Sequence, residues 1–197
     1  MPNEDGLQFK VTLLDVDPPV WRRIQVPAAY SFWDLHVAIQ DAMGWLDYHL
    51  HQFKLSTGSD SPVVIGIPDD EFPSGRETLP GWEIPVARYL ANPGDKAKYE
   101  YDFGDGWEHD ILLEATVPPL AGATYPRCIE GEHACPPEDC GGPFGYGEFV
   151  KAISDPAHDR HQELLEWVGG AFAPDEFDAR SIEFDDPAER WELAFSE

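Results

Sequence analysis

The sequence predicts a single α+β domain with a mixed, mainly antiparallel sheet and helices packed on one face. Several short segments alternate apolar and polar residues, as half-buried strands do. One segment near the N-terminus has apolar residues at helical spacing between capping signals. An Asp-Gly pair separates two further alternating segments and indicates a hairpin. The predicted order is ββαβ(α)ββαα, and its ββαβ opening also fits a β-grasp-like half.

Two strands are expected at the start of the chain. Residues 7–16 alternate, with Phe9, Val11 and Leu13 on one face. Residues 20–26 alternate as well and follow a proline-containing turn. The two segments are therefore predicted to pair as a hairpin.

An amphipathic helix is predicted to begin after Ser31. Ser31 with Asp34 three residues later resembles a capping box, with the shorter Asp in place of Glu. Leu35 and Ile39 then start an apolar row at fourfold spacing. Gly44 is suited to end this helix in a left-handed turn.

The remaining elements follow from shorter patterns. Segments 56–78 and 118–143 are rich in Gly, Pro and Asp, and both are predicted to be irregular. The other predictions are a strand at residues 50–55, a short helix at 85–90, strands at 98–103 and 108–117, and helices at 146–154 and 160–168.

Length and composition favour one globular domain. The chain has 197 residues, and 42% of them are hydrophobic, which is enough to bury a core. The expected organisation is a disordered tail at residues 1–6, one domain at 7–177 and a partly packed acidic extension at 178–197. No apolar run approaches the ~20 residues that span a bilayer. The polar N-terminus also lacks a signal-peptide pattern, so a cytoplasmic location is expected.

The charge restricts the partners. Lys and Arg total 13 against 38 Asp and Glu, which gives a net charge of −25. A field of this sign repels phosphate backbones and anionic membranes, so direct nucleic-acid binding is disfavoured. The acids either serve solubility or recruit a basic partner. The first interpretation is favoured because they are spread along the whole chain.

Polar and aromatic side chains gather around the predicted Asp-Gly hairpin. The candidate ligand-binding residues there are Tyr101, Asp102, Asp105, Trp107 and His109. The two carboxylates could simply accept turn N–H groups, and the indole could belong to the core. An imidazole among carboxylates could instead have a raised pKa or bind a metal.

His49 and His51 are a second candidate pair. On a strand, residues two apart point to the same face, which is a common geometry for metal binding. The alternative is two half-buried rings whose nitrogens have ordinary partners.

Cys128, Cys135 and Cys140 are a candidate metal site. Three thiols with His133 or His109 would complete a tetrahedral zinc site. The spacings differ from those of zinc ribbons, and the alternative is three small buried hydrophobes. An odd number of cysteines without an export signal argues against a disulfide framework.

Catalytic signatures are absent from the sequence. The glycine-rich segment 141–147 precedes a predicted helix, but it has no Walker lysine, so phosphate binding is disfavoured. No nucleophile elbow or Ser-His-Asp order is present either.

The motifs jointly resemble the plasmid pRiA-type open-reading-frame-three-like family over residues 7 to about 177. They are Pro19-Val20-Trp21-Arg22-Arg23, Gly44-Trp45 with His49-Leu50-His51-Gln52-Phe53, Tyr101-Asp102-Phe103-Gly104-Asp105 with Trp107 and His109, and Pro137-Glu138-Asp139-Cys140-Gly141-Gly142 with Gly145-Tyr146. The resemblance implies a compact α+β domain of largely uncharacterised microbial proteins, found also on plasmids and in insertion elements. It implies no accepted catalytic residues.

Three functions are consistent with these observations. The preferred one is a non-enzymatic binding or adaptor module that holds a protein or small-molecule ligand between the hairpin and the cysteine segment, because no catalytic set is recognisable. The second is a metal-dependent hydrolase or nucleic-acid-processing enzyme that uses His49, His51, Asp102, Asp105 and His109. The third is a structural zinc domain held by the three cysteines.

Overall fold

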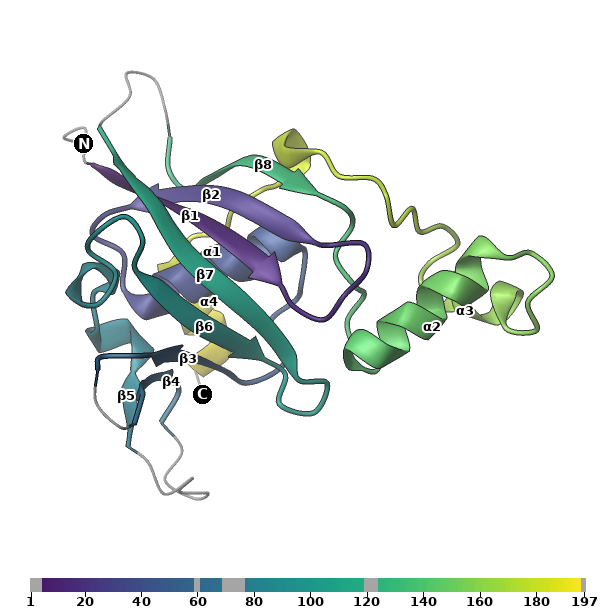
Figure 1. Cartoon of the computed structure of the whole chain (residues 1–197), viewed down its shortest axis with the longest axis horizontal. Helices are drawn as coiled ribbons and strands as arrows, with labels where there is room; N and C mark the ends of the chain where they lie inside the picture. The colour runs from purple at the N-terminus through teal and green to yellow at the C-terminus, as the bar shows by residue number, and fades with distance from the viewer. Residues whose placement is uncertain (1–4, 59–60, 69–76, 119–123, 196–197) are drawn as a thin grey trace.

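The computed structural model describes residues 5–58, 61–68, 77–118 and 124–195. Its centre is an eight-stranded sheet with the strand order β5-β4-β3-β6-β7-β1-β2-β8 (Figure 1). Neighbouring strands are antiparallel except for the parallel β4–β5 pair. The α+β class with a mainly antiparallel sheet is therefore confirmed.

The elements have the following bounds. The strands are β1 (Gly6–Leu13), β2 (Trp21–Pro27), β3 (His51–Leu55), β4 (Val63–Gly66), β5 (Thr78–Pro80), β6 (Lys96–Tyr101), β7 (Trp107–Val117) and β8 (Arg127–Glu132). The helices are α1 (Phe32–Met43), α2 (Gly142–Ser154), α3 (His161–Trp167) and α4 (Pro187–Phe195), with short 3-10 turns η1 (Gly81–Glu83), η2 (Val86–Arg88) and η3 (Ala179–Ser181).

Two strands lie in segments that were predicted to be irregular: β4 in segment 56–78 and β8 in segment 118–143. A third strand that was not predicted, β5, begins where the first of these segments ends. β4 and β5 have only four and three residues, and the residues of β8 do not alternate between buried and exposed, so the sequence carries no clear strand pattern there. The helix predicted at 85–90 is the 3-10 turn η2. Gly6, placed by the sequence in a disordered tail, already belongs to β1, and residues 1–4 lie outside the described ranges.

α1 and α4 cover one face of the sheet, whereas α2 and α3 lie beyond the strand ends (Figure 1). The expectation of helices on one face therefore holds for α1 and α4 only. The core lies under α1, where alternate residues of β1 and β7 such as Phe9 and Leu113 are fully buried. The opposite face carries ion pairs, among them Arg23–Glu114 at 2.6 Å. None of the helices in the described residues could cross a membrane.

The acidic extension packs through α4. The Trp191 ring lies 5.3 Å from the Trp33 ring of α1, and Arg190 pairs with Asp41 of α1 at 2.8 Å. The Trp33 Nε1–H also donates to the Pro187 carbonyl over 3.0 Å. Aromatic residues at helical spacing thus fix the chain end on α1.

The capping box of α1 is confirmed. The Asp34 N–H donates to Ser31 Oγ over 3.2 Å, and the Ser31 N–H donates to Asp34 Oδ2 over 2.8 Å. We expect Ser31→Ala to lower the free energy of unfolding by about 1 kcal/mol, because one N–H at the helix start loses its acceptor. Urea denaturation measures this change. Ser154→Ala at the C-terminal end of α2 is the matched control, and equal stability of the two variants would contradict the prediction.

Candidate functional site

Four side chains from three separate segments converge beside the ends of β3 and β6. His49 comes from the connection between α1 and β3, and Asp102 comes from the β6–β7 turn. Glu138 and Asp139 come from the segment before α2. We call these four residues the polar centre.

His49 Nε2 is the atom that the three carboxylates surround. It lies 3.1 Å from Asp139 Oδ1 and 3.6 Å from Asp102 Oδ2. Glu138 Oε2 is 3.9 Å away. The nitrogen is shielded from solvent, yet it makes no hydrogen bond with any group in the described part of the chain. One ligand atom each from His49, Asp102 and Asp139 all lie within 4.8 Å of one another, as a shared metal ion requires.

Two hydrogen bonds to Oε1 hold the Glu138 side chain in place. Its Oε1 accepts hydrogen bonds from the Leu46 N–H at 2.8 Å and from the Tyr101 hydroxyl at 3.0 Å. That hydroxyl in turn accepts the Tyr48 N–H over 3.1 Å. Burial, followed by the Glu138 charge, raises the pKa of Tyr101, so the phenol remains a donor. These bonds leave Glu138 Oε2 directed toward the imidazole.

Asp102 divides its two oxygens in the same way. Oδ1 accepts the N–H groups of Gly104 and Asp105 at 2.9 and 3.2 Å, while Oδ2 faces His49. The backbone φ angles of Asp102 and Asp139 are +53° and +55°, in the left-handed region that few side chains adopt.

The β6–β7 turn is locked against the start of α2. Asp105 Oδ2 accepts the Gly141 N–H over 3.0 Å. A Cβ atom at Gly142 would lie 2.3 Å from the Asp105 carbonyl oxygen, so only glycine fits there. This contact fixes Asp102 relative to Glu138 and Asp139.

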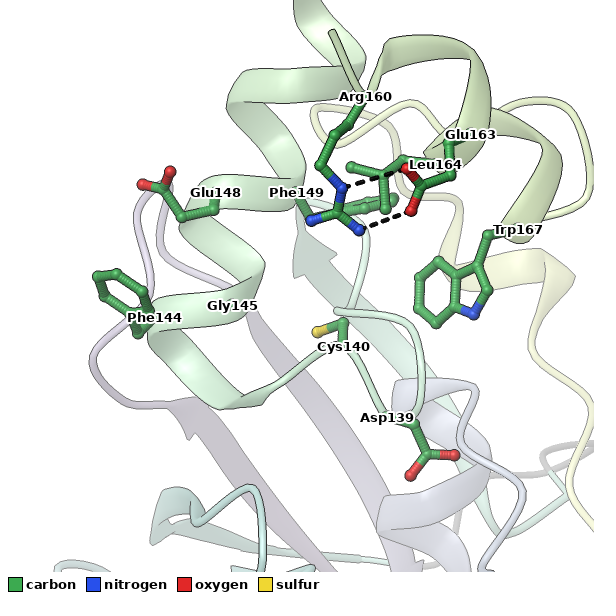
Figure 2. Close-up of a pocket in the computed structure, with 10 residues that line it drawn as sticks. All are labelled: Asp139, Cys140, Phe144, Gly145, Glu148, Phe149, Arg160, Glu163, Leu164 and Trp167. Atoms are coloured by element: carbon green, nitrogen blue, oxygen red, sulfur yellow. Dashed lines mark hydrogen bonds and ion pairs between the residues drawn. The ribbon is translucent and has the colours of Figure 1, made fainter.

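A cleft of about 590 Å³ opens beside the polar centre, and Asp139 belongs to both (Figure 2). Phe144 and Trp167 lie on opposite sides of the cleft with Cys140 between them, and Arg160 pairs with Glu163 at 2.8 Å. Burial, with a smaller contribution from Asp105, raises the pKa of the Cys140 thiol to about 12. The thiol is therefore protonated and a poor nucleophile.

Exposed apolar side chains border the same region. They are Leu46, Tyr48 and Leu50 next to His49, Phe103 next to Asp102, and Phe144 in the first turn of α2. Phe144 is 83% exposed and Tyr48 is 71% exposed. We call these five residues the apolar rim. Large apolar side chains gathered around a polar site are typical of surfaces that bind a partner.

Other predicted site residues lie elsewhere. Trp107 and His109 lie on β7 and are fully buried in the core between the sheet and α1. Burial lowers the pKa of His109 to about 3, so its ring is neutral rather than protonated. The expected shared face of His49 and His51 is wrong, because β3 begins only at His51 and His49 precedes it.

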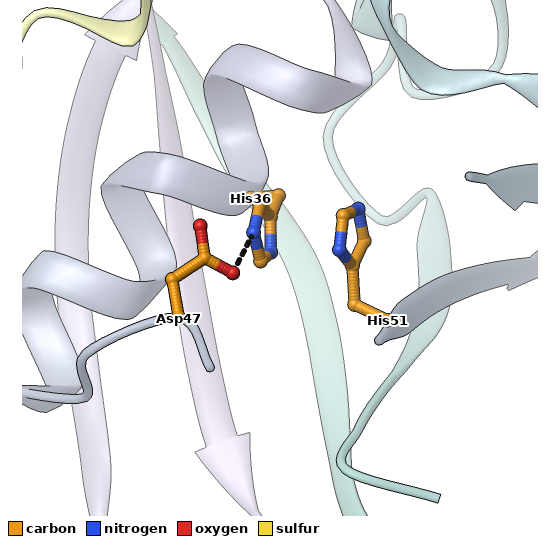
Figure 3. Close-up of side chains that lie close together, drawn as sticks. All are labelled: His36, Asp47 and His51. Atoms are coloured by element: carbon orange, nitrogen blue, oxygen red, sulfur yellow. Dashed lines mark hydrogen bonds and ion pairs between the residues drawn. The ribbon is translucent and has the colours of Figure 1, made fainter. Parts of the chain in front are cut away.

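His51 belongs to a different group, with His36 and Asp47 (Figure 3). The His36 and His51 rings stack at 3.4 Å, and Asp47 Oδ1 lies 2.8 Å from His36 Nε2. His36 Nδ1 lies 2.8 Å from the Tyr99 hydroxyl, so both nitrogens of His36 have partners. The in-plane lone pairs of parallel rings do not converge, and a metal here would require the rings to separate. This group is better suited to join α1 to β3 and β6.

The three cysteines carry free thiols. Within the described ranges, neither group of potential metal ligands includes a cysteine. One proposed fourth ligand, His133, has its Nδ1 2.8 Å from the Pro19 carbonyl oxygen, and the other, His109, is in the core. The structural zinc site therefore stays a prediction.

The sequence patterns predict two of the four residues of the polar centre, His49 and Asp102. They predict no ligand role for Glu138 and Asp139, nor for His36 and Asp47. The signal for Glu138 and Asp139 was present in the Pro137–Gly142 motif that carries the family resemblance.

Similar proteins exist in bacteria and archaea. The uncharacterised protein y4hQ of Sinorhizobium fredii is 40% identical over 193 residues, which cover 94% of this chain and 93% of that protein. A crystal structure of a protein of unknown function, MM3350 from Methanosarcina mazei Go1, has a TM-score of 0.81 and 36% identity, covering 92% of this chain and 99% of that one. The family model described as plasmid pRiA4b ORF-3-like protein matches residues 5–181, so the chain belongs to this family.

Proposed function

We propose that this protein is a binding module that holds a divalent metal ion at the polar centre and recognises its ligand in the adjoining cleft. The observation that carries the proposal is the buried His49 Nε2, which has no hydrogen bond in the described residues although three carboxylates surround it. A cation placed here would be shared by ligand atoms of His49, Asp102 and Asp139, which lie within 4.8 Å of one another. The net charge of −25 further attracts a cation.

The chemistry of the donors indicates the class of metal. One imidazole nitrogen with carboxylate oxygens suits Mn²⁺, Fe²⁺, Co²⁺ or Zn²⁺ better than Ca²⁺, which prefers oxygen ligands alone. Asp139 has a side chain that is 67% exposed, so one side of the centre faces solvent. A ligand or water would take a coordination position on that side.

The cleft and the apolar rim suggest how a ligand would be held. A polar group of the ligand would reach the metal past Asp139, and its apolar part would lie against Phe144 and Trp167. The ligand is expected to be a protein segment or a small molecule rather than a nucleic acid, because the net charge opposes a phosphate backbone.

The metal affinity of the variant Asp102→Asn tests the proposal. The Asn side chain keeps an Oδ1 for Gly104 and Asp105 and tolerates positive φ, so the turn is preserved. Loss of the Oδ2 charge is expected to weaken Mn²⁺ and Zn²⁺ binding at least about tenfold. Calorimetric titration and elemental analysis of untagged protein measure this.

Two variants make that result specific. Asp110→Asn, which removes a carboxylate paired with Lys98 on β7, is expected to bind metal as the parent protein does. A metal retained in Asp102→Asn but lost in Cys135→Ser would identify the thiols as the site and would reject the polar centre. Absence of metal binding by the parent protein would reject it as well.

A metal-dependent hydrolase is the second candidate function. It is favoured by the exposed side of the centre, since catalytic metal sites keep a position for water whereas structural sites are closed. Hydrolysis of ester substrates that appears on adding metal and disappears in Asp102→Asn would favour this function over binding alone.

A further inference from the structure

A second pocket lies between the start of α1, η1 and α4. Its volume is about 500 Å³, and its lining includes Trp33, Trp82 and Trp191. It shares no lining residue with the cleft beside the polar centre. Trp191 also lies beyond residues 5–181, the segment that the family model matches. We call this the tryptophan pocket.

The three indoles pack against one another at different angles. The Trp191 ring centroid is 5.3 Å from that of Trp33 at an interplanar angle of 89° and 4.6 Å from that of Trp82 at 61°, and the Phe195 ring packs on Trp191 at 4.1 Å. Trp33 is 4% exposed, and its Nε1–H donates a hydrogen bond to the Pro187 carbonyl oxygen, whereas Trp82 is 37% exposed. The pocket therefore has a fixed inner wall and an accessible outer one.

The charged residues that line the pocket in the described part of the chain all have one sign. They are the carboxylates of Asp34, Glu83 and Glu192, and no described Lys or Arg is among the lining residues. One oxygen of Asp34 accepts the Ser31 N–H. Neither Glu83 nor Glu192 takes part in an ion pair among the described residues. Arg190, on the same helix as Trp191, is paired instead with Asp41 and Asp185.

The pKa of a neighbouring phenol agrees with this negative field. Tyr30, adjacent in sequence to the lining residues Ala29 and Ser31, has its pKa raised, first by burial and then by Asp34, Asp186 and Asp41. The pocket thus combines aromatic faces with an excess of carboxylates.

We propose that the tryptophan pocket binds a methylated ammonium group. Such a cation is attracted to the faces of indole rings, and Trp is the strongest aromatic partner for it. Methyl groups also weaken its hydration, so it enters an apolar pocket more readily than Na⁺ or a primary ammonium does. The carboxylates of Glu83 and Glu192 at the pocket add charge complementarity. A free trimethylammonium compound and a trimethylated lysine side chain share this chemistry.

Calorimetric titration with choline and with its neutral carbon isostere, 3,3-dimethylbutanol, tests the charge requirement at matched ionic strength. Saturable binding of choline with no binding of the isostere is the expected result. Titration with Nε-trimethyllysine then distinguishes the two sources, because a pocket built for a side chain binds this compound more tightly than choline. Absence of binding by both cations, or equal binding of the isostere, would overturn the proposal.

Three variants locate the binding. Trp82→Ala is expected to weaken choline binding roughly fivefold to thirtyfold, and Glu83→Gln about twofold to fivefold. Both residues are exposed, so the fold is expected to persist, and circular dichroism verifies this. Trp167→Ala, which removes a similarly exposed indole from α3, is the matched control. Loss of binding in Trp167→Ala with retention in Trp82→Ala would place the cation elsewhere and reject the pocket.

Discussion

Lowering the pH from 7 to 5 is expected to remove about 2 kcal/mol of folding free energy through His109 alone. The ring is fully buried in the core on β7, where its Nδ1 lies 3.3 Å from the Tyr99 carbonyl oxygen and its Nε2 has no partner in the described residues. Burial lowers the pKa of His109 from 6.5 to about 3. Below pH 6.5 the unfolded chain therefore binds a proton that the folded chain excludes. Stability falls as the pH drops from 6.5 toward 3.

The variant His109→Asn isolates this contribution. Asn places an amide where Nδ1 lies but does not titrate, so the slope of unfolding free energy against pH is expected to fall by about 1.4 kcal/mol per pH unit between pH 4 and 6. Urea denaturation at several pH values measures the slope. Ile111→Val, two residues along the same strand, should lower stability at every pH without changing the slope. An unchanged slope in His109→Asn would contradict the prediction.

The regular parts of the fold were predictable because their residues alternate or repeat over several turns. Phe9, Val11 and Leu13 identified β1, and the Ser31–Asp34 pair with Gly44 marked both ends of α1. β8, with the sequence Arg-Cys-Ile-Glu-Gly-Glu, was not predictable. It is an edge strand, and its residues do not alternate between buried and exposed positions.

The polar centre was predictable only in part, for a different reason. His49 and Asp102 were identified by residue type, but their partners, Glu138 and Asp139, lie in the segment before α2, 36 and 37 residues after Asp102 in the sequence. Only tertiary contacts, such as that between Asp105 and Gly141, bring these segments together. His109 was misjudged because its neighbours in sequence are polar, while alternation on β7 directs it to the core with Trp107.

Arg22 is expected to contribute more to stability than any exposed ion pair. It is 2% exposed, and its guanidinium donates to the carbonyl oxygens of Ala42 and Glu132 at 2.9 Å each and to that of Trp21 at 2.8 Å. Its terminal carbon lies 3.8 Å from the centre of the Phe177 ring. The residue therefore joins β2 to the last turn of α1, to β8 and to the segment before η3.

Arg22→Met is expected to lower the free energy of unfolding by about 3–5 kcal/mol, because buried carbonyl oxygens would lose charged donors that Met cannot replace. The Ala42 oxygen lies in the last turn of α1, where helical carbonyls lack an internal partner and the helix dipole favours a cation. The neighbouring Arg23 is the matched control. It lies on the opposite face of β2 and pairs with Glu114 near the surface, so Arg23→Met should cost at most about 1 kcal/mol. Equal losses in the two variants, measured by urea denaturation, would show that the buried carbonyl contacts do not carry the stability assigned to them. Hydrogen exchange provides a second readout: β8 amides should lose protection in Arg22→Met and keep it in Arg23→Met.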